Sequence, residues 1–246
     1  MALPTSRLRR PISGLGVALL TLGAGSACAT ATATGTDLRP GASTAPPITA
    51  ASAHTGGWPG PQLSSISAAR KELTALAIAD RWETMDGYAR EKFPHWMSQG
   101  NSCDTRESVL ERDGQDVQID SLCRSVTGTW YSVYDGLTLR DPAKTNTAHL
   151  VPLANAWRSG ADKWTSAQRK VFANDLTHPQ LLTVSAESNR AKGDQGPEDW
   201  KPPMKTAWCG YARAWVDVKT AYNLSVTKAE KTALGQMLDT CPGADD

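Results

Sequence analysis

The spacing of hydrophobic and polar positions changes along this chain between helical and strand types. In residues 62–80, apolar side chains recur at helical spacing, which predicts a helix there. Cys103 opens a second helix that continues through Arg112, where Asp104 and Glu107 have the spacing of an N-terminal capping box. Helical patterns also predict segments over residues 154–158, 165–174 and 205–222, and a last helix. Thr165 begins the second of these with capping-box spacing, and Thr227 caps the last helix.

Strand-type spacing appears in the middle of the chain. β-branched and aromatic residues favour strands over residues 117–119 and 126–134. The Asp135-Gly136 pair predicts a tight hairpin turn, after which residues 137–139 return as a second strand. Because this hairpin precedes His149, we expect it to be the framework that presents that histidine.

Two polar residues, His149 and Asn189, each lie near a short apolar run. His149 stands at the start of a strand-like run over residues 150–153, and Asn189 comes after a second run, 181–184, and the start of a short helix. A strand, a long loop and a second strand that feeds a helix can bring the two side chains together. Imidazole can take a proton from water, and an oxygen ligand can help to hold a hard divalent ion. This combination suits a one-metal phosphodiesterase.

The residues around this pair form an ordered motif. In chain order its members are His149, Pro152, Leu153, Ala156, Trp157, Asn189, Lys192, Gly193 and Asp194. Each is ordinary alone, since an asparagine near a helix start is most often a cap and Lys-Gly-Asp is a good turn. Together they resemble the HNH (ββα-metal) nucleases, in particular a secreted bacterial HNH endonuclease family related to the C-terminal domain of the GmrSD restriction endonucleases. The resemblance spans about residues 87–241.

The resemblance implies an α+β fold with an HNH (ββα-metal) nuclease core, in which several helices flank a small antiparallel hairpin. It makes His149 the general base and Asn189 the ligand of a divalent metal, for which we expect Mg²⁺, with Mn²⁺ or Ca²⁺ as alternatives. The expected substrate is nucleic acid, DNA with low sequence specificity. We place Asn146 and Lys192 with His149 as catalytic residues.

Two arginines in the matching region are candidate phosphate contacts. Arg90 lies in a Gly-Tyr-x-Arg-x-x-Phe motif, and Arg106 ends a Cys-Asp-Thr-Arg motif that also matches the family. A guanidinium can bind phosphate through paired hydrogen bonds. The alternatives are a structural ion pair for Arg90 and a contact that attaches its helix to the core for Arg106.

Two positions depart from the family pattern, because Asn146 and Ala148 stand where acidic residues are usual. An alanine methyl cannot coordinate a cation, and an amide is a weaker ligand for hard ions than a carboxylate. One alternative is therefore a weakened or inactive HNH scaffold that acts as an extracellular or envelope binding protein. However, nonspecific nucleases with an Asp-Arg-Gly-His motif also have a small residue before the histidine. Asp194 could supply the missing carboxylate only if the fold bends it inward.

Composition and charge restrict where nucleic acid could bind. The chain of 246 residues is 40% hydrophobic and has 9 Trp against 2 Phe, so we expect indoles to take the place of Phe in the core. Its formal net charge is +1, and without the three arginines of the leader 23 basic residues remain against 25 acidic ones. The resulting net charge of −2 is not typical of a tight nucleic-acid binder. Any basic groove must be local.

The first part of the chain reads as an export signal and a tether. Residues 1–29 have a basic start, an apolar run too short for a membrane span and small residues around Cys28, which predicts a signal peptide. Ordinary cleavage and a lipid on Cys28 both stay open. Residues 30–61 are rich in Ala, Thr and Pro and predict a disordered linker, followed by the nuclease-like domain over 62–246. We expect a monomer without a transmembrane span, secreted or anchored to the outer face of the membrane.

Four cysteines remain after Cys28, and an exported chain with four cysteines suggests two disulfides. Three connectivities are possible. Proximity in the sequence and the pattern of the resembling family favour Cys103–Cys123 and Cys209–Cys241. A zinc site is the competing interpretation, but the chain contains no CxxC pair.

Overall fold

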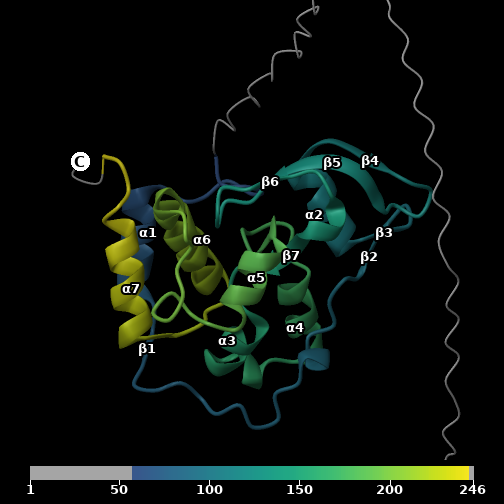
Figure 1. The fold of residues 1–246 in the computed structure, drawn as a ribbon. Helices are drawn as coiled ribbons and strands as arrows, with labels where there is room; N and C mark the ends of the chain where they lie inside the picture. Colours follow the sequence, from purple (N-terminus) through teal and green to yellow (C-terminus); the bar gives the residue numbers. More distant parts are fainter. Residues whose placement is uncertain (1–56, 244–246) are drawn as a thin grey trace, which may run out of the picture. The chain divides into compact units, whose positions relative to one another are not determined.

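The computed structural model describes residues 57–243 (Figure 1). The predicted signal peptide, Cys28 and nearly all of the predicted linker lie outside these residues. Trp58, within the predicted linker range, packs against the core at a ring-centroid distance of 6.4 Å from Tyr211. No helix in the described part of the chain is long and apolar enough to cross a membrane.

Helices and short sheets alternate along the described residues, so the α+β class is confirmed (Figure 1). The α-helices are α1 Ile66–Ala75, α2 Thr105–Asp113, α3 Leu153–Arg158, α4 Ser166–Ala173, α5 Ala186–Lys192, α6 Trp208–Ala221 and α7 Lys228–Leu238. The strands are β1 Ile78–Ala79, β2 Ser98–Gly100, β3 Cys103–Asp104, β4 Gly114–Ile119, β5 Ser125–Tyr131, β6 Thr138–Leu139, β7 Thr145–His149, β8 Leu181–Ser185 and β9 Val226–Thr227. They form one sheet in the order β4-β5-β6 and three two-stranded pairs, β1-β9, β2-β3 and β7-β8.

Both predicted disulfides are confirmed. Cys103 is bonded to Cys123 across a Cα–Cα distance of 5.0 Å, and Cys209 to Cys241 across 4.9 Å. The first joins β3 to the loop between β4 and β5, and the second joins α6 to the segment after α7. In the chain-entropy model each bond stabilises the fold by about 3–4 kcal/mol.

The helices begin at the predicted caps, whereas their predicted lengths are less accurate. Thr165 and Thr227 both form complete capping boxes. Asp104 caps α2 by accepting the backbone N–H of Glu107 at 2.9 Å, but the Glu107 carboxylate bonds to Ser125 instead of returning to the cap. The predicted helix over 62–80 is too long at both ends, because Ser65 caps its start and Ile78 leaves it to pair with β9.

The expected turn at Asp135-Gly136 is present, but the hairpin that it closes does not carry His149. The Ser132 N–H donates to Leu137 O at 2.8 Å, and β5 and β6 pair antiparallel on either side. His149 lies instead on β7, which pairs with β8. The expectation that the 126–139 hairpin presents the histidine is therefore wrong.

His149 also ends its strand rather than preceding one. Residues 150–153 turn away from β7 and lead into α3, which begins directly after Pro152. Gln180 holds this turn, since its carbonyl accepts from Leu150 N at 2.7 Å and its side-chain oxygen accepts from Val151 N at 3.1 Å. The apolar residues of the run pack into the core without forming a strand.

The free edge of β8 is covered by the end of α2. The Thr183 N–H donates to the Asp113 carboxylate at 2.7 Å, and the Arg112 guanidinium donates to Leu181 O at 2.7 Å. An open strand edge would present unpaired N–H and C=O groups to other chains. Here two charged side chains satisfy that edge, so the β7–β8 ribbon ends at two strands.

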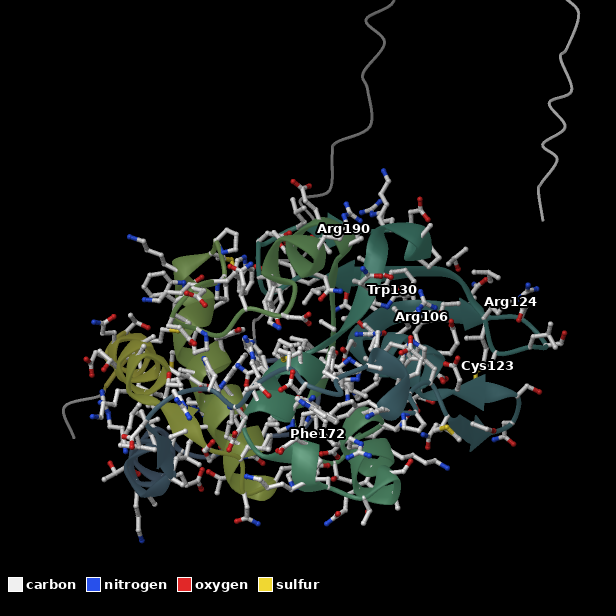
Figure 2. All side chains as sticks on the ribbon, turned by 90° about the horizontal axis from the view of Figure 1, so that it is seen from below. Arg106, Cys123, Arg124, Trp130, Phe172 and Arg190 are labelled. Carbon is white, nitrogen blue, oxygen red and sulfur yellow. A yellow bond between two sulfur atoms is a disulfide. The ribbon has the colours of Figure 1, made fainter. Side chains whose placement is uncertain are left out.

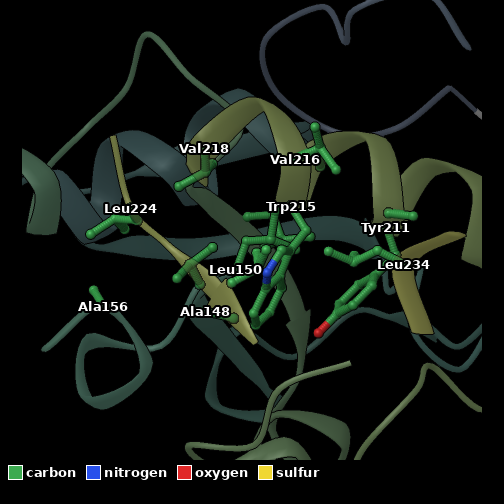
Figure 3. Close-up of a cluster of buried hydrophobic side chains, with 14 of the residues drawn as sticks. Ala148, Leu150, Ala156, Tyr211, Trp215, Val216, Val218, Leu224 and Leu234 are labelled. Atoms are coloured by element: carbon green, nitrogen blue, oxygen red, sulfur yellow. The ribbon is translucent and has the colours of Figure 1, made fainter. Parts of the chain in front are cut away.

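A helical layer formed by α1, α6 and α7 packs beside this ribbon (Figure 1). Trp215 of α6 is fully buried, and Ala148 of β7 and Leu150, directly after that strand, lie close to it (Figure 3). Trp130 is also fully buried, and several other indoles pack at the margin of the core. The expectation that Trp replaces Phe in the core is confirmed for these residues.

An ion pair lies inside this layer. Lys219 and Glu230 are both fully buried, with 3.1 Å between Nζ and Oε1. Lys219 also donates to Ser159 Oγ at 2.6 Å and to Ser225 O at 2.8 Å, and Glu230 accepts from Trp215 Nε1 at 2.7 Å. These bonds connect α6 with α7 and with the ends of α3 and β9.

Removing one partner of this pair leaves the other charge buried. We expect Glu230→Ala to lower the free energy of unfolding by about 3–5 kcal/mol, because the Lys219 ammonium loses its counter-charge. Glu83→Ala is the matched control, since the Glu83–Lys163 pair is exposed and should contribute less than about 1 kcal/mol. Urea denaturation of the oxidised protein measures both, and equal effects of the two variants would contradict the assignment.

Candidate functional site

A ribbon and a helix, β7–β8–α5, position the candidate site. Thr145 pairs with Ser185 and His149 with Leu181, so the two strands run antiparallel over five residue pairs. Ser185 ends β8 and caps α5 by accepting the Ser188 N–H at 3.1 Å. Because side chains alternate along a strand, Thr147 and His149 share one face of β7 and Ala148 takes the other. The short helix then carries Asn189 to the face of His149.

One pocket lies against this face. It has a volume of about 140 Å³, and its lining is mostly polar. The lining residues are Arg90, Thr147, His149, Pro152, Leu153, Asn189, Gly193 and Asp194. The structure thus brings the predicted base, the predicted metal ligand and one predicted phosphate contact together in a single cavity.

His149 is held in one orientation at the wall of this pocket. Its side chain is nearly buried, and Nε2 lies 3.0 Å from the carbonyl oxygen of Ala173, the last residue of α4. A carbonyl can only accept, so Nε2 carries the hydrogen and Nδ1 keeps the lone pair. Burial lowers the pKa of His149 to about 3, with Arg90 acting in the same direction. The imidazole is therefore neutral at pH 7.

Two aromatic rings cover the other side of the imidazole. The Trp96 ring centroid lies 5.5 Å from that of His149 at an interplanar angle of 31°, and the His95 centroid lies at 6.2 Å. Trp96 has a φ of 58°, a left-handed conformation that is rare for a bulky residue. The Nδ1 atom of His95 lies 2.7 Å from Phe93 O, which fixes this ring beside the imidazole. The contact between Trp96 and His149 was not predicted, because no local spacing in the sequence signals it.

Gly193 turns the chain so that Asp194 comes back to the pocket. It ends α5 with a φ of 51° and donates its N–H to Asn189 O at 3.0 Å. A glycine adopts this conformation without steric cost. Asp194 thereby joins Asn189 among the residues that line the pocket. A ligand role for Asp194 requires this placement beside the pocket.

Lys192 does not line the pocket, although it lies between Asn189 and Asp194 in the sequence. Its side chain is buried, Nζ donates to the backbone oxygen of His149 at 3.2 Å, and it lies 5.7 Å from the centroid of the Trp215 ring. Burial lowers the pKa of Lys192 to about 7, against the opposing effect of Asp194. These contacts favour a positioning role over the predicted catalytic one, since the ammonium holds the end of β7 against α5.

Asn146 is also misplaced for the role predicted from the sequence. It pairs with Val184 in the ribbon and shares the strand face of Ala148, away from His149. Ala148 is 1% exposed and belongs to the hydrophobic cluster (Figure 3). Neither residue lines the pocket, because strand alternation turns both away from it.

The two candidate arginines have different surroundings. Arg106 forms an ion pair with Glu107, and its backbone oxygen faces the Thr147 hydroxyl at 3.5 Å, so it attaches α2 to β7 instead of facing the pocket. Figure 2 shows Arg106 close to Trp130, beside α2 and β5. Arg90 is exposed, lines the pocket and has no carboxylate partner among residues 57–243. Of the two, only Arg90 remains a candidate phosphate contact.

Asp135 connects the β5–β6 turn to the start of α5. Its Oδ2 accepts hydrogen bonds from the hydroxyls of Ser185 and Ser188, the latter at 2.7 Å. Burial by itself raises the pKa of Asp135, but hydrogen bonds from serine hydroxyls lower it more, so the carboxyl stays below its usual range. The carboxylate thus holds the helix that carries Asn189.

Another cluster of ligand-type side chains lies at Cys103, Glu111 and Cys123. Both sulfur atoms are used in the disulfide. Because a disulfide sulfur is not a thiolate, this cluster is not a zinc site. Within the described residues, the polar pocket beside His149 is the better candidate for a hard cation.

Comparison with known proteins defines the family. Residues 104–237 match the GmrSD restriction endonucleases, C-terminal domain, and this is more than half of the chain. The chain therefore belongs to that family. It is 51% identical over 181 residues to an uncharacterized secreted protein of Arthroderma benhamiae, which covers 74% of this chain and 88% of the relative. The relative's description agrees with the predicted export, whereas its source does not support a restriction to bacteria. No solved structure matches the chain.

The role of Asp135 can be tested by changing only its charge. We expect Asp135→Asn to lower the free energy of unfolding by about 1–2 kcal/mol at pH 7, because hydrogen bonds to a charged acceptor are stronger than those to a neutral one. Asp80→Asn, at an exposed position on the surface, is the control.

The difference between wild type and Asp135→Asn should also depend on pH. A carboxyl whose pKa is lowered by folding stabilises the protein above its ordinary value of 3.8, and this contribution is lost as the pH falls through the folded pKa. Denaturation curves from pH 7 to acid pH should therefore converge below about pH 4. A constant difference across this range would argue against a charged Asp135.

Proposed function

We propose that this chain is an exported, metal-dependent endonuclease that hydrolyses phosphodiester bonds of nucleic acid, DNA with low sequence specificity. The observation that supports it most strongly is the convergence of His149, Asn189 and Asp194 on one pocket of a β7–β8–α5 unit. The strand, strand, helix order is that of an HNH core. The family to which the chain belongs supports the same reaction class.

The donor atoms in the pocket fit a hard divalent ion. Asn189 offers an amide oxygen, Asp194 a carboxylate and Thr147 a hydroxyl oxygen. Oxygen donors of this kind suit Mg²⁺ first, and Mn²⁺ or Ca²⁺ as alternatives. A bound ion would neutralise charge on the phosphate and on the leaving oxygen. Asn189 and Asp194 are the residues that would hold it.

His149 is arranged to take a proton from water. Ala173 O fixes the hydrogen on Nε2, so Nδ1 is the basic nitrogen. The low pKa keeps the imidazole unprotonated over the whole neutral range. An isolated base of this kind is weak, but an anionic phosphate in the pocket favours the protonated imidazolium and raises its pKa. Base strength would therefore increase when substrate is present.

Arg90 is the residue on this wall that can bind the phosphate. Its guanidinium is exposed at the pocket and is able to form paired hydrogen bonds with phosphate oxygens. The mature chain has a net charge near zero, so attraction for nucleic acid must come from such local positions. Export of the chain, as for its secreted relative, agrees with its two disulfides.

The alternative function is a weakened or inactive nuclease scaffold that acts as a binding protein outside the cell. Ala148 favours it, because the family pattern has an acidic residue beside the histidine. In this structure Ala148 faces the hydrophobic cluster and Asp194 brings a carboxylate to the pocket. That geometry favours the active enzyme over the inactive scaffold.

The first experiment is plasmid nicking by the purified, oxidised protein with Mg²⁺, Mn²⁺ or Ca²⁺ and an EDTA control. We expect metal-dependent cleavage, and a loss of about 10²–10⁴-fold in rate for His149→Ala, because removal of a general base costs that much. His178→Ala is the matched control, since His178 is a half-exposed histidine away from the pocket.

Two results would decide against this function. Cleavage that His149→Ala leaves unchanged would exclude His149 as the base. The absence of cleavage with any metal, by a protein that is correctly folded, would exclude the nuclease and favour the binding protein. Circular dichroism of each variant checks that the fold is retained.

The role of Asp194 is tested by the metal dependence of the rate. We expect Asp194→Asn to raise the Mg²⁺ concentration needed for half-maximal cleavage by about tenfold or more, because an amide binds hard cations less well than a carboxylate. Asp199→Asn, which changes an exposed carboxylate of the same loop outside the pocket, should leave it unchanged. An equal shift for both variants would mean that only the overall charge matters.

A further inference from the structure

A second pocket, of about 350 Å³, opens on a neighbouring face of α5. Its aliphatic part includes Leu137 and Leu139 from the β6 region and Ala186 from α5, and Lys144, Arg190 and Glu187 supply its charged groups. Leu137 is 46% exposed, so part of its apolar surface is open to a ligand. Figure 2 shows Arg190 at the surface on α5.

The pocket is attached to the candidate site through one helix and one strand. Arg190 directly follows Asn189 in α5, and the Ala186/Arg190 face lies next to the Asn189/Gly193 face of the same helix. Lys144 directly precedes β7, and His149 ends that strand. At about 3.3 Å per residue, the start of β7 is roughly 13 Å from His149. The two pockets thus lie within the reach of one short nucleic-acid segment.

The charges in this pocket are available for a ligand. Lys144 and Arg190 are exposed, and in the part of the chain that the structure describes neither has a carboxylate partner. Asp135, the nearby acid of the β5–β6 turn, is occupied by Ser185 and Ser188. A nucleotide combines an anionic phosphate with a less polar sugar and base. The side chains of Lys144 and Arg190 suit the phosphate, and the aliphatic side chains beside them suit the sugar or base. Glu187 can accept hydrogen bonds from a base amino group.

We propose that this pocket is a second nucleotide subsite, which holds the same nucleic-acid strand roughly two to four nucleotides from the bond that is cleaved. Lys144 and Arg190 bind a phosphate, and the side chains of Leu137 and Leu139 contact the sugar or base. The inference rests on the proposed function for its choice of ligand. It also explains how a chain with net charge near zero could hold a nucleic acid strand through a local basic site.

The test measures binding separately from cleavage. Fluorescence anisotropy with short labelled single-stranded and duplex DNA, in EDTA across a series of salt concentrations, is carried out in the His149→Ala background. Adding Lys144→Gln and Arg190→Gln should raise Kd about tenfold. The slope of log Kd against log salt should fall by roughly 0.7 for single strands, because one phosphate contact is lost.

Lys71→Gln with Lys228→Gln is the matched control, since it removes two exposed cations from α1 and α7, outside both pockets. We expect this pair to leave Kd and the salt slope nearly unchanged. Equal effects of the two double variants, no effect of either, or the absence of measurable DNA binding would overturn the subsite. Binding of RNA instead of DNA, with the same dependence on Lys144 and Arg190, would support the subsite and change only the assigned substrate.

The outcome can be separated from that of the proposed function. If the wild-type chain cleaves DNA but Lys144 and Arg190 affect neither Kd nor KM, the subsite fails and the nuclease remains. If the chain cleaves nothing but binding depends on both cations, the nuclease fails and the subsite remains. For an active enzyme, the double variant should raise KM about tenfold with little change in kcat, because the contact is remote from the reacting bond.

Discussion

The contact between the end of α2 and the free edge of β8 is the constraint on which the candidate site depends. A two-stranded ribbon is marginal alone, and its exposed edge would invite further pairing. Asp113 and Arg112 satisfy that edge from one side, while α5 contacts both strands. The ribbon can therefore stay short, with one face toward the hydrophobic cluster and the other toward the pocket, and His149 is held at its end.

Charged groups around the pocket fall into two classes that sequence alone does not separate. Lys192 and Arg106 are committed to the protein, one to the backbone of His149 and the other to Glu107. Arg90 and Asp194 remain exposed at the cavity. The committed cations hold strands and helices in place, and the exposed groups are the ones that can meet a ligand. Charge counted along the chain is therefore a poor guide to the chemistry of this site.

Sequence reasoning predicted what local chemistry determines. The caps at Thr165 and Thr227, the Asp135-Gly136 turn and the disulfide pairing were all confirmed. It failed where partners are distant in sequence, since strand pairing made β8 rather than the 126–139 hairpin the neighbour of His149. It also did not foresee that Asn146 and Lys192 lie outside the pocket lining. Which way a side chain points depends on strand alternation and on the bend at Gly193, and a motif fixes neither.

The segment between β7 and β8 supplies the hydrogen-bond acceptor that fixes the tautomer of His149. It spans residues 150–180, forms α3 and α4, and returns the carbonyl of Ala173 to the imidazole that precedes it. The proton on His149 is thus assigned by a peptide group 24 residues further along. An insertion or deletion in α4 would move that carbonyl and remove the hydrogen bond that fixes the hydrogen on Nε2, with every pocket residue intact. The length of this segment therefore bears on the tautomer of His149 as well as on packing.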